Sequence, residues 1–69
     1  MTAEKREALK RLVKLKALAH LSGTSINYLS MIINNNRSCS LDLAEKLADK
    51  ANMLQQEVTF SPLDFMRNN

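Results

Sequence analysis

A single glycine, Gly23, lies between two helix-like runs in the stretch "LAHLSGTSINYLSMIINNNR", residues 18–37. Two short helices that pack across each other at roughly 90 to 120° are joined by a tight turn in which one residue has a positive φ angle. Glycine adopts this conformation without steric strain because it has no Cβ atom. The position of the only glycine therefore predicts a bend between two crossing helices.

The apolar pattern predicts helices on both sides of this bend. Residues 3–22 contain neither glycine nor proline, and their apolar positions drift around a single helix, so two helices joined near residues 13–16 fit better than one. These apolar positions are Ala8, Leu9, Leu12, Val13, Leu15, Leu18, Ala19 and Leu21. After the bend, Thr24 or Ser25 is a suitable N-cap for a helix that ends within residues 34–36, all asparagine.

Two further helices are expected in the second half of the chain. Ser40 is a suitable N-cap for a helix that runs to about Met53. The tail allows two interpretations: "EVTF" (57–60) has strand propensity, whereas "SPLDFM" (61–66) has a serine N-cap followed by proline at the first helical position. We favour a short terminal helix, because a lone strand would have no partner.

Length and composition agree with a small helical core. The chain has 69 residues, of which 45% are hydrophobic and only 4% aromatic, so aliphatic side chains must supply most of the core. We expect one all-α domain over residues 1–69, a compact bundle of four to five short helices that contains a helix-turn-helix. The expected core residues are Leu18, Ala19, Leu29 and Ile32 at the crossing, with Ile33, Leu43, Ala44, Leu47, Ala48, Ala51, Met53, Leu54, Phe60, Leu63, Phe65 and Met66 elsewhere.

Charge is distributed unevenly along the chain, whose formal net charge is +3. Residues 1–37 hold most of the basic groups and residues 38–69 most of the acidic ones. Arg6, Lys10 and Lys14 are spaced to form a basic stripe on the first helix, and Glu7 is one turn from Arg11 and can pair with it. The asymmetry is compatible with binding to a polyanion, although a basic helical face that is simply solvated is the plain alternative.

Several functional classes lack the residues that they need. Cys39 is the only cysteine, which excludes an internal disulfide and a cysteine-based zinc site. We expect it to be a small structural filler. A lone thiol also fits a reducing compartment, most simply the cytoplasm. His20 has no partner at metal-ligand spacing, so we expect neither a metal nor a cofactor. The sequence has no paired acids, glycine-rich phosphate loop or Ser–His–Asp set, and no apolar run long enough for a membrane span. We therefore expect neither an enzyme nor a membrane partner.

The segment "LAHLSGTSINYLSMIINNNRSCSLDLAEKLADKA" resembles the helix-turn-helix domain of Cro and lambda-repressor-type regulators, particularly small phage or prophage Cro-like proteins and their YdaS-like relatives. These proteins commonly read LA, a small residue before glycine, TS, YLS, a helix-ending Asn-Gly, a basic residue and Pro-Ser. The resemblance covers roughly residues 8–54, and the tail "EVTFSPLDF" is also similar. Asn35 stands where glycine is usual and Cys39 where proline is usual, and no Ser/Thr–Gln pair opens the second helix.

The resemblance implies two sets of residues that contact DNA. Asparagine can bind adenine through two hydrogen bonds, serine is permissive, and methionine or isoleucine can touch a thymine methyl group. The base-edge candidates are Ser25, Ile26, Asn27, Ser30 and Met31, and the phosphate candidates are Lys16, Tyr28, Asn36 and Arg37. For Ile26, burial in the core is an open alternative because it shares a face with Leu29, whereas Met31 is expected to be exposed.

The function that the resemblance implies is sequence-specific transcriptional regulation, most closely by a phage or prophage Cro-like repressor in the bacterial or phage-infected cytoplasm. Such a protein places the helix after Gly23 in the major groove of a double-stranded DNA operator, and we expect a weak homodimer that can form on the DNA. Two alternatives stay open. One is the DNA-binding component of a toxin–antitoxin-like pair, and the other is a protein-interaction module of the antirepressor type.

Overall fold

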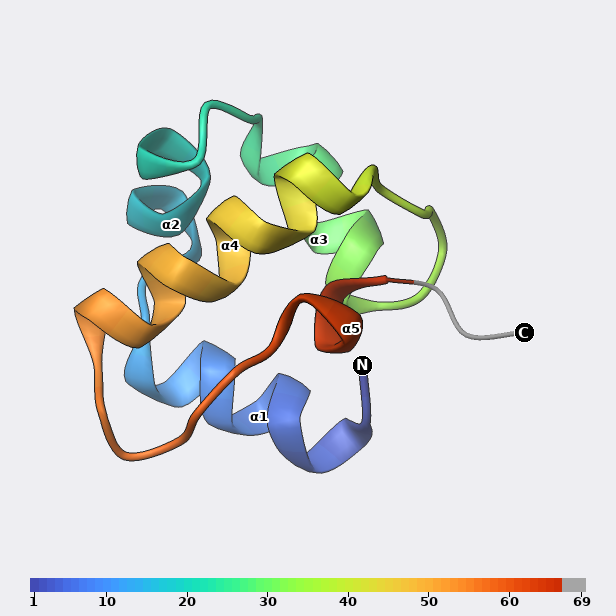
Figure 1. The fold of residues 1–69 in the computed structure, drawn as a ribbon. Helices are drawn as coiled ribbons and strands as arrows, with labels where there is room; N and C mark the ends of the chain where they lie inside the picture. The colour runs from blue at the N-terminus through green and yellow to red at the C-terminus, as the bar shows by residue number, and fades with distance from the viewer. Residues whose placement is uncertain (67–69) are drawn as a thin grey trace.

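The computed structural model describes residues 1–66, and within them the chain forms five helices and no strand (Figure 1). The helices are α1 (Ala3–Leu12), α2 (Leu15–Leu21), α3 (Ile26–Ile33), α4 (Leu41–Leu54) and α5 (Pro62–Phe65). The expected all-α bundle of short helices is confirmed. The last three residues of the expected 1–69 domain lie outside the described part of the chain.

Serine and threonine side chains begin three of the helices. The hydroxyl oxygens of Thr2, Ser25 and Ser40 accept hydrogen bonds from backbone amides in the first turns of α1, α3 and α4, at 3.1 to 3.2 Å. Ser25 rather than Thr24 is thus the N-cap of α3. Val13 and Lys14 have extended backbone angles between α1 and α2, which confirms the predicted break there.

The core lies where α4 packs against α2 and α5, and where α2 packs against α3. Figure 1 shows α4 crossing the middle of the molecule, with α1 along the bottom of the view, beginning near the N-terminus. All the residues expected at the crossing of α2 and α3 are buried, and Phe60 and Phe65 from the tail complete the core. The buried hydrophobic residues are Leu9, Val13, Leu18, Ala19, Leu29, Ile32, Ile33, Ala44, Leu47, Ala48, Ala51, Phe60 and Phe65.

Three residues that the sequence pattern predicted as part of the core are exposed. Met53 (63% exposed) and Leu54 belong to the last turn of α4, where the chain leaves the core, so the prediction that they are core residues was wrong. The prediction that Leu63 is a core residue was also wrong. Leu63 is 67% exposed, because α5 is only four residues long and places Phe65 in the core instead. Leu21, the last residue of α2, is exposed as well.

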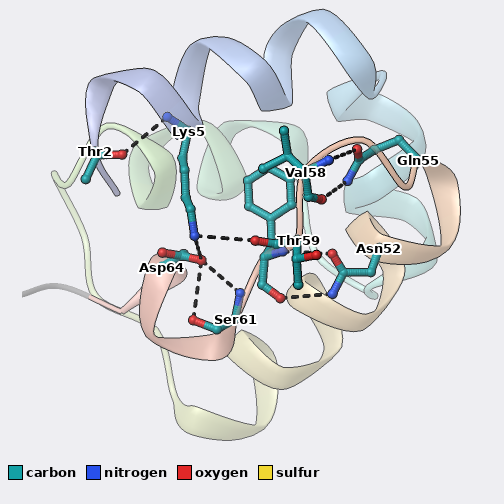
Figure 2. Close-up of polar contacts among 9 residues, drawn as sticks. Thr2, Lys5, Asn52, Gln55, Val58, Thr59, Ser61 and Asp64 are labelled. Atoms are coloured by element: carbon teal, nitrogen blue, oxygen red, sulfur yellow. Dashed lines mark hydrogen bonds and ion pairs between the residues drawn. The ribbon is translucent and has the colours of Figure 1, made fainter.

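The tail is held to the bundle by side-chain amides of α4 (Figure 2). Asn52 donates to the carbonyl of Phe60 at 2.9 Å and accepts from its amide at 2.8 Å. Gln55 makes the same pair of bonds with Val58, at 2.6 and 2.9 Å. These amides satisfy the backbone groups of Val58 and Phe60, and "EVTF" forms no strand. The preferred terminal helix is confirmed.

Two ion pairs join α1 to the tail. Lys5 Nζ lies 2.7 Å from Asp64 Oδ2, and Arg11 Nη2 lies 2.7 Å from Glu57 Oε2. Arg11 therefore pairs with Glu57, which the folded tail brings beside α1, and the expected pair with Glu7 was wrong. Lys5 Nζ also donates to the Thr59 carbonyl at 3.4 Å and lies 5.8 Å from the centroid of the Phe60 ring.

Candidate nucleic-acid interface

The turn between α2 and α3 has the geometry that the single glycine predicts. Gly23 has a φ angle of +72°, and a Cβ atom added there would meet no atom within 4 Å. The amide of Thr24 donates to the Ala19 carbonyl at 2.9 Å, which closes the turn against the end of α2. The chain thus leaves α2 sharply and enters α3 through its N-cap Ser25, with Leu18 and Leu29 buried on either side of the bend.

Helix α3 has one buried face and one exposed face. Leu29, Ile32 and Ile33 are buried, which fixes the rotation of the helix about its axis. Asn27 and Met31 (37% exposed) are exposed on the opposite face, and Ile26 is 46% exposed in the first turn, although it lies on the same side of the helix as Leu29. The alternative that Ile26 is a core residue is therefore wrong, and the expected exposure of Met31 is confirmed.

The two serines among the base-edge candidates have hydrogen-bond partners in their own helix. Ser25 is exposed, and its hydroxyl oxygen accepts a bond from the amide of Tyr28 at 3.1 Å. Ser30 is half-buried, and its oxygen accepts a bond from the side-chain amide of Asn34 at 3.4 Å. Each hydroxyl can still donate one hydrogen bond, so Ser25 presents a donor at the surface while Ser30 lies deeper.

The loop after α3 is folded back onto the end of that helix. Asn35 has a φ angle of +62°, the left-handed conformation that ends a helix, at the position where the resemblance has glycine. The amides of Asn36 and Arg37 both donate to the carbonyl of Met31, at 2.8 and 3.3 Å. This arrangement places two of the phosphate candidates, Asn36 and Arg37, exposed at the C-terminal end of α3.

Tyr28 connects α3 to this loop. Its hydroxyl donates a hydrogen bond to the carbonyl of Ser38 at 3.1 Å, and the guanidinium carbon of Arg37 lies 5.8 Å from the centroid of its ring. Tyr28 is half-buried and packs against the core. The sequence did not predict the hydrogen bond from Tyr28 to the Ser38 carbonyl, because every residue has a backbone carbonyl and its residue type does not mark it as an acceptor.

Lys16 is the phosphate candidate that belongs to another element. It is exposed in the first turn of α2, whereas the side chain of Tyr28, from the first turn of α3, reaches the loop that carries Asn36 and Arg37. Of the residues in the expected basic stripe, Lys10 and Lys14 are exposed and Arg6 is half-buried. The structure thus groups three of the four phosphate candidates and leaves Lys16 on the neighbouring helix.

A family model described as helix-turn-helix matches residues 3–57, which is most of the chain and includes α1 to α4. The chain belongs to the helix-turn-helix family. Domains of this kind bind DNA with the second helix of the motif, which is α3 in this chain. No match was found among the curated proteins or among the solved structures.

Within this helix-turn-helix domain, the exposed side of α4 has the opposite electrostatic character from the α3 loop. Asp42, Glu45 and Asp49 line a shallow hollow there together with Lys46. Carboxylates at this density repel phosphate groups. The acidic side of α4 is therefore less suited to a polyanion than the end of α3 that carries Arg37.

Cys39 and His20 are the other two side chains that the sequence raised as candidates for chemistry. Cys39 is half-buried, its thiol donates to the Phe65 carbonyl at 3.4 Å, and burial raises the pKa of the thiol, as suits a structural filler. His20 is exposed, and no group of three or more potential metal ligands occurs within residues 1–66. In the same part of the chain, no helix has the length and apolar character that spanning a membrane requires.

Proposed function

We propose that this helix-turn-helix protein is a sequence-specific transcriptional regulator of the Cro-like phage or prophage type, which represses transcription by occupying operator DNA. The observation that carries the proposal is the exposed face of α3, where Ile26, Asn27 and Met31 project from a helix fixed by its buried side. A helix held in this way can enter the major groove without rearrangement of the domain.

In the proposed complex the two sets of candidates have separate tasks. Contacts to base edges come from α3 and carry the sequence information, whereas contacts to phosphates set the register and supply much of the affinity. The base-edge set is Ser25, Ile26, Asn27, Ser30 and Met31, and the phosphate set is Lys16, Tyr28, Asn36 and Arg37. Because the hydroxyl hydrogen of Tyr28 is directed at Ser38, its oxygen would meet a phosphate through a water molecule or a neighbouring donor.

A weak homodimer on the operator is part of the proposal. One α3 of eight residues contacts only a few base pairs, so two copies on a pseudo-palindromic site are needed for useful specificity. Half-sites on one face of DNA are about 34 Å apart. The backbone measures 27 × 24 × 18 Å, so two copies docked one helical turn apart would approach each other near the centre of the site.

Selection of bound sequences from a random duplex pool tests the proposal most directly. We expect an enriched palindrome with half-sites one helical turn apart, and a loss of about 1 to 3 kcal/mol on that operator, with little loss on a scrambled duplex, for Asn27→Ala. Failure to enrich any sequence would contradict the proposal. Tight binding to another regulator without duplex binding would instead support an antirepressor-type module.

A further inference from the structure

The exposed face of α3 is uncharged over its whole length. The helix reads "INYLSMII" and contains no Lys, Arg, Asp or Glu. Its most exposed side chains are Ile26, Asn27 and Met31, two of which are apolar. If this helix enters a DNA groove, its apolar side chains are stabilised only where the DNA offers apolar groups that remove them from water.

Only some base pairs suit this set of side chains. In the major groove, guanine is read mainly by Arg or Lys at O6 and N7, and the amino group of cytosine by Asp or Glu. Adenine is read by Asn or Gln at N6 and N7, and the C5 methyl group of thymine by apolar contacts. The exposed face of α3 lacks the first two kinds of residue and presents both of the others.

Arg37 is the first basic residue after α3, and it belongs to the loop rather than to the exposed face of the helix. Arg37 follows the end of the helix by four residues, its amide is bonded to the Met31 carbonyl, and its guanidinium lies against the Tyr28 ring. A guanidinium at that place extends the footprint toward the backbone of the duplex. It does not supply a bidentate donor at the positions that Asn27 and Met31 would cover.

We propose that α3 reads A·T pairs, with Asn27 binding the N6 and N7 edge of adenine and with Ile26 and Met31 packing on thymine methyl groups. The inference rests on the proposed function and adds the class of base pair that the same site recognises. Burial of one methyl group against such a surface changes affinity by about fourfold. Because the effects of separate contacts multiply, several thymine contacts in two half-sites give a large preference for sites with A·T pairs at these positions.

Base analogues in the selected operator test this inference on the wild-type protein. Replacing single thymines by uracil removes only the methyl group, and 7-deazaadenine removes only the N7 acceptor. We expect a loss of about fourfold per contacted methyl group in duplex titrations, and a loss of similar or larger size at the adenine that Asn27 binds. Selected half-sites with G·C pairs where α3 docks, or affinity that is unchanged by every uracil and every 7-deazaadenine, would overturn the inference.

Variants then assign each contact to a residue. Met31→Ala should bind the thymine operator more weakly than wild type and should no longer distinguish thymine from uracil at one position in each half-site. Met53→Ala is the matched control, because Met53 is even more exposed but lies in the last turn of α4. It should distinguish thymine from uracil as the wild type does. Equal behaviour of the two variants would overturn the role of Met31.

The outcomes separate this inference from the proposed function. Specific binding to a site read through G·C pairs would leave the regulator proposal intact and remove the A·T assignment. Absence of specific binding to any duplex would remove both. Since the analogue series uses the unaltered protein, the result does not depend on whether any variant folds.

Discussion

The guanidinium carbon of Arg37 lies 5.8 Å from the centroid of the Tyr28 ring, and the hydroxyl of Tyr28 is bonded to the carbonyl of Ser38, the residue after Arg37. The distance is within the range of a cation–π contact. Tyr28 belongs to α3, whereas Arg37 and Ser38 belong to the following loop. The two contacts of the Tyr28 side chain therefore connect the helix to the loop. A positive charge is thereby kept beside the end of the helix that we propose enters the groove.

From this position we expect Arg37 to contact a phosphate. Arg37→Ala should weaken binding to operator and scrambled duplex alike and should lower the slope of log affinity against log salt by about one per subunit. Arg37→Lys is the matched control and should keep the slope, because it keeps the charge. Titrations at several salt concentrations measure both. A changed sequence preference with an unchanged slope would place Arg37 on a base edge.

The turn gives a second prediction, which concerns backbone conformation alone. A Cβ atom at Gly23 would meet nothing within 4 Å, so a substitution is costly only through the φ angle of +72°. Gly23→Val should lower the free energy of unfolding by more than about 1 kcal/mol.

Gly23→Asn is the control for the turn, because asparagine tolerates the left-handed region and this chain already uses Asn35 at +62°. We expect it to be less destabilising than Gly23→Val in urea unfolding. Equal stability of the two variants would mean that the φ angle at the turn is not the source of the cost.

The core gives a third prediction. Leu29 is fully buried between α3 and the rest of the bundle, and Leu29→Ala should cost about 2 to 5 kcal/mol, a large share of the stability of so small a domain. Ile26→Ala, in the same helix but 46% exposed, should cost less than about 1 kcal/mol. Thermal unfolding followed by circular dichroism compares them. A Leu29→Ala variant as stable as Ile26→Ala would contradict the burial of Leu29.

Local rules were sufficient to predict the helices and the bend. Gly23 needed only its freedom in φ, Ser25 and Ser40 only their capping oxygens, and the start of α5 only the Ser61–Pro62 pair. Each of these signals acts within four residues of itself, which is why it can be read from the sequence. The exposure of Asn27 and Met31 followed from the same periodicity once Leu29 was assigned to the core, whereas the exposure of Ile26, which shares a face with Leu29, did not.

Contacts between distant segments could not be predicted in the same way. Asn52 binds the backbone of Phe60 and Arg11 binds Glu57, and no spacing in the sequence indicates either pair. The orientation of Leu63 depends on a four-residue helix, which is too short to show a period. In the candidate site, the hydrogen bond between Tyr28 and the loop could not be predicted either, because its acceptor is the backbone carbonyl of Ser38.

The last prediction concerns acid stability and the Lys5–Asp64 pair, which fastens α5 to α1 (Figure 2). Partial burial raises the pKa of Asp64, but the hydrogen bond and charge of Lys5 and the hydrogen bonds from Ser61 outweigh it and hold the pKa below its ordinary value. A carboxyl group with a lowered pKa in the folded state stabilises the fold above its ordinary pKa. That contribution is lost as the pH falls below about 4.

Asp64→Asn should therefore lower the free energy of unfolding by about 1 kcal/mol near pH 7 and should flatten the decline of stability in acid. Glu57→Gln is the matched control, because Glu57 also pairs with a residue of α1: its Oε2 lies 2.7 Å from Arg11 Nη2. Both side chains of this pair are largely exposed. Solvent screens such a pair, so this variant should change stability by less than about 0.5 kcal/mol and leave the acid profile unaltered. Urea unfolding between pH 7 and pH 2 measures both variants. If Glu57→Gln altered the acid profile as much as Asp64→Asn did, the partial burial of Asp64 would not be what distinguishes the two pairs.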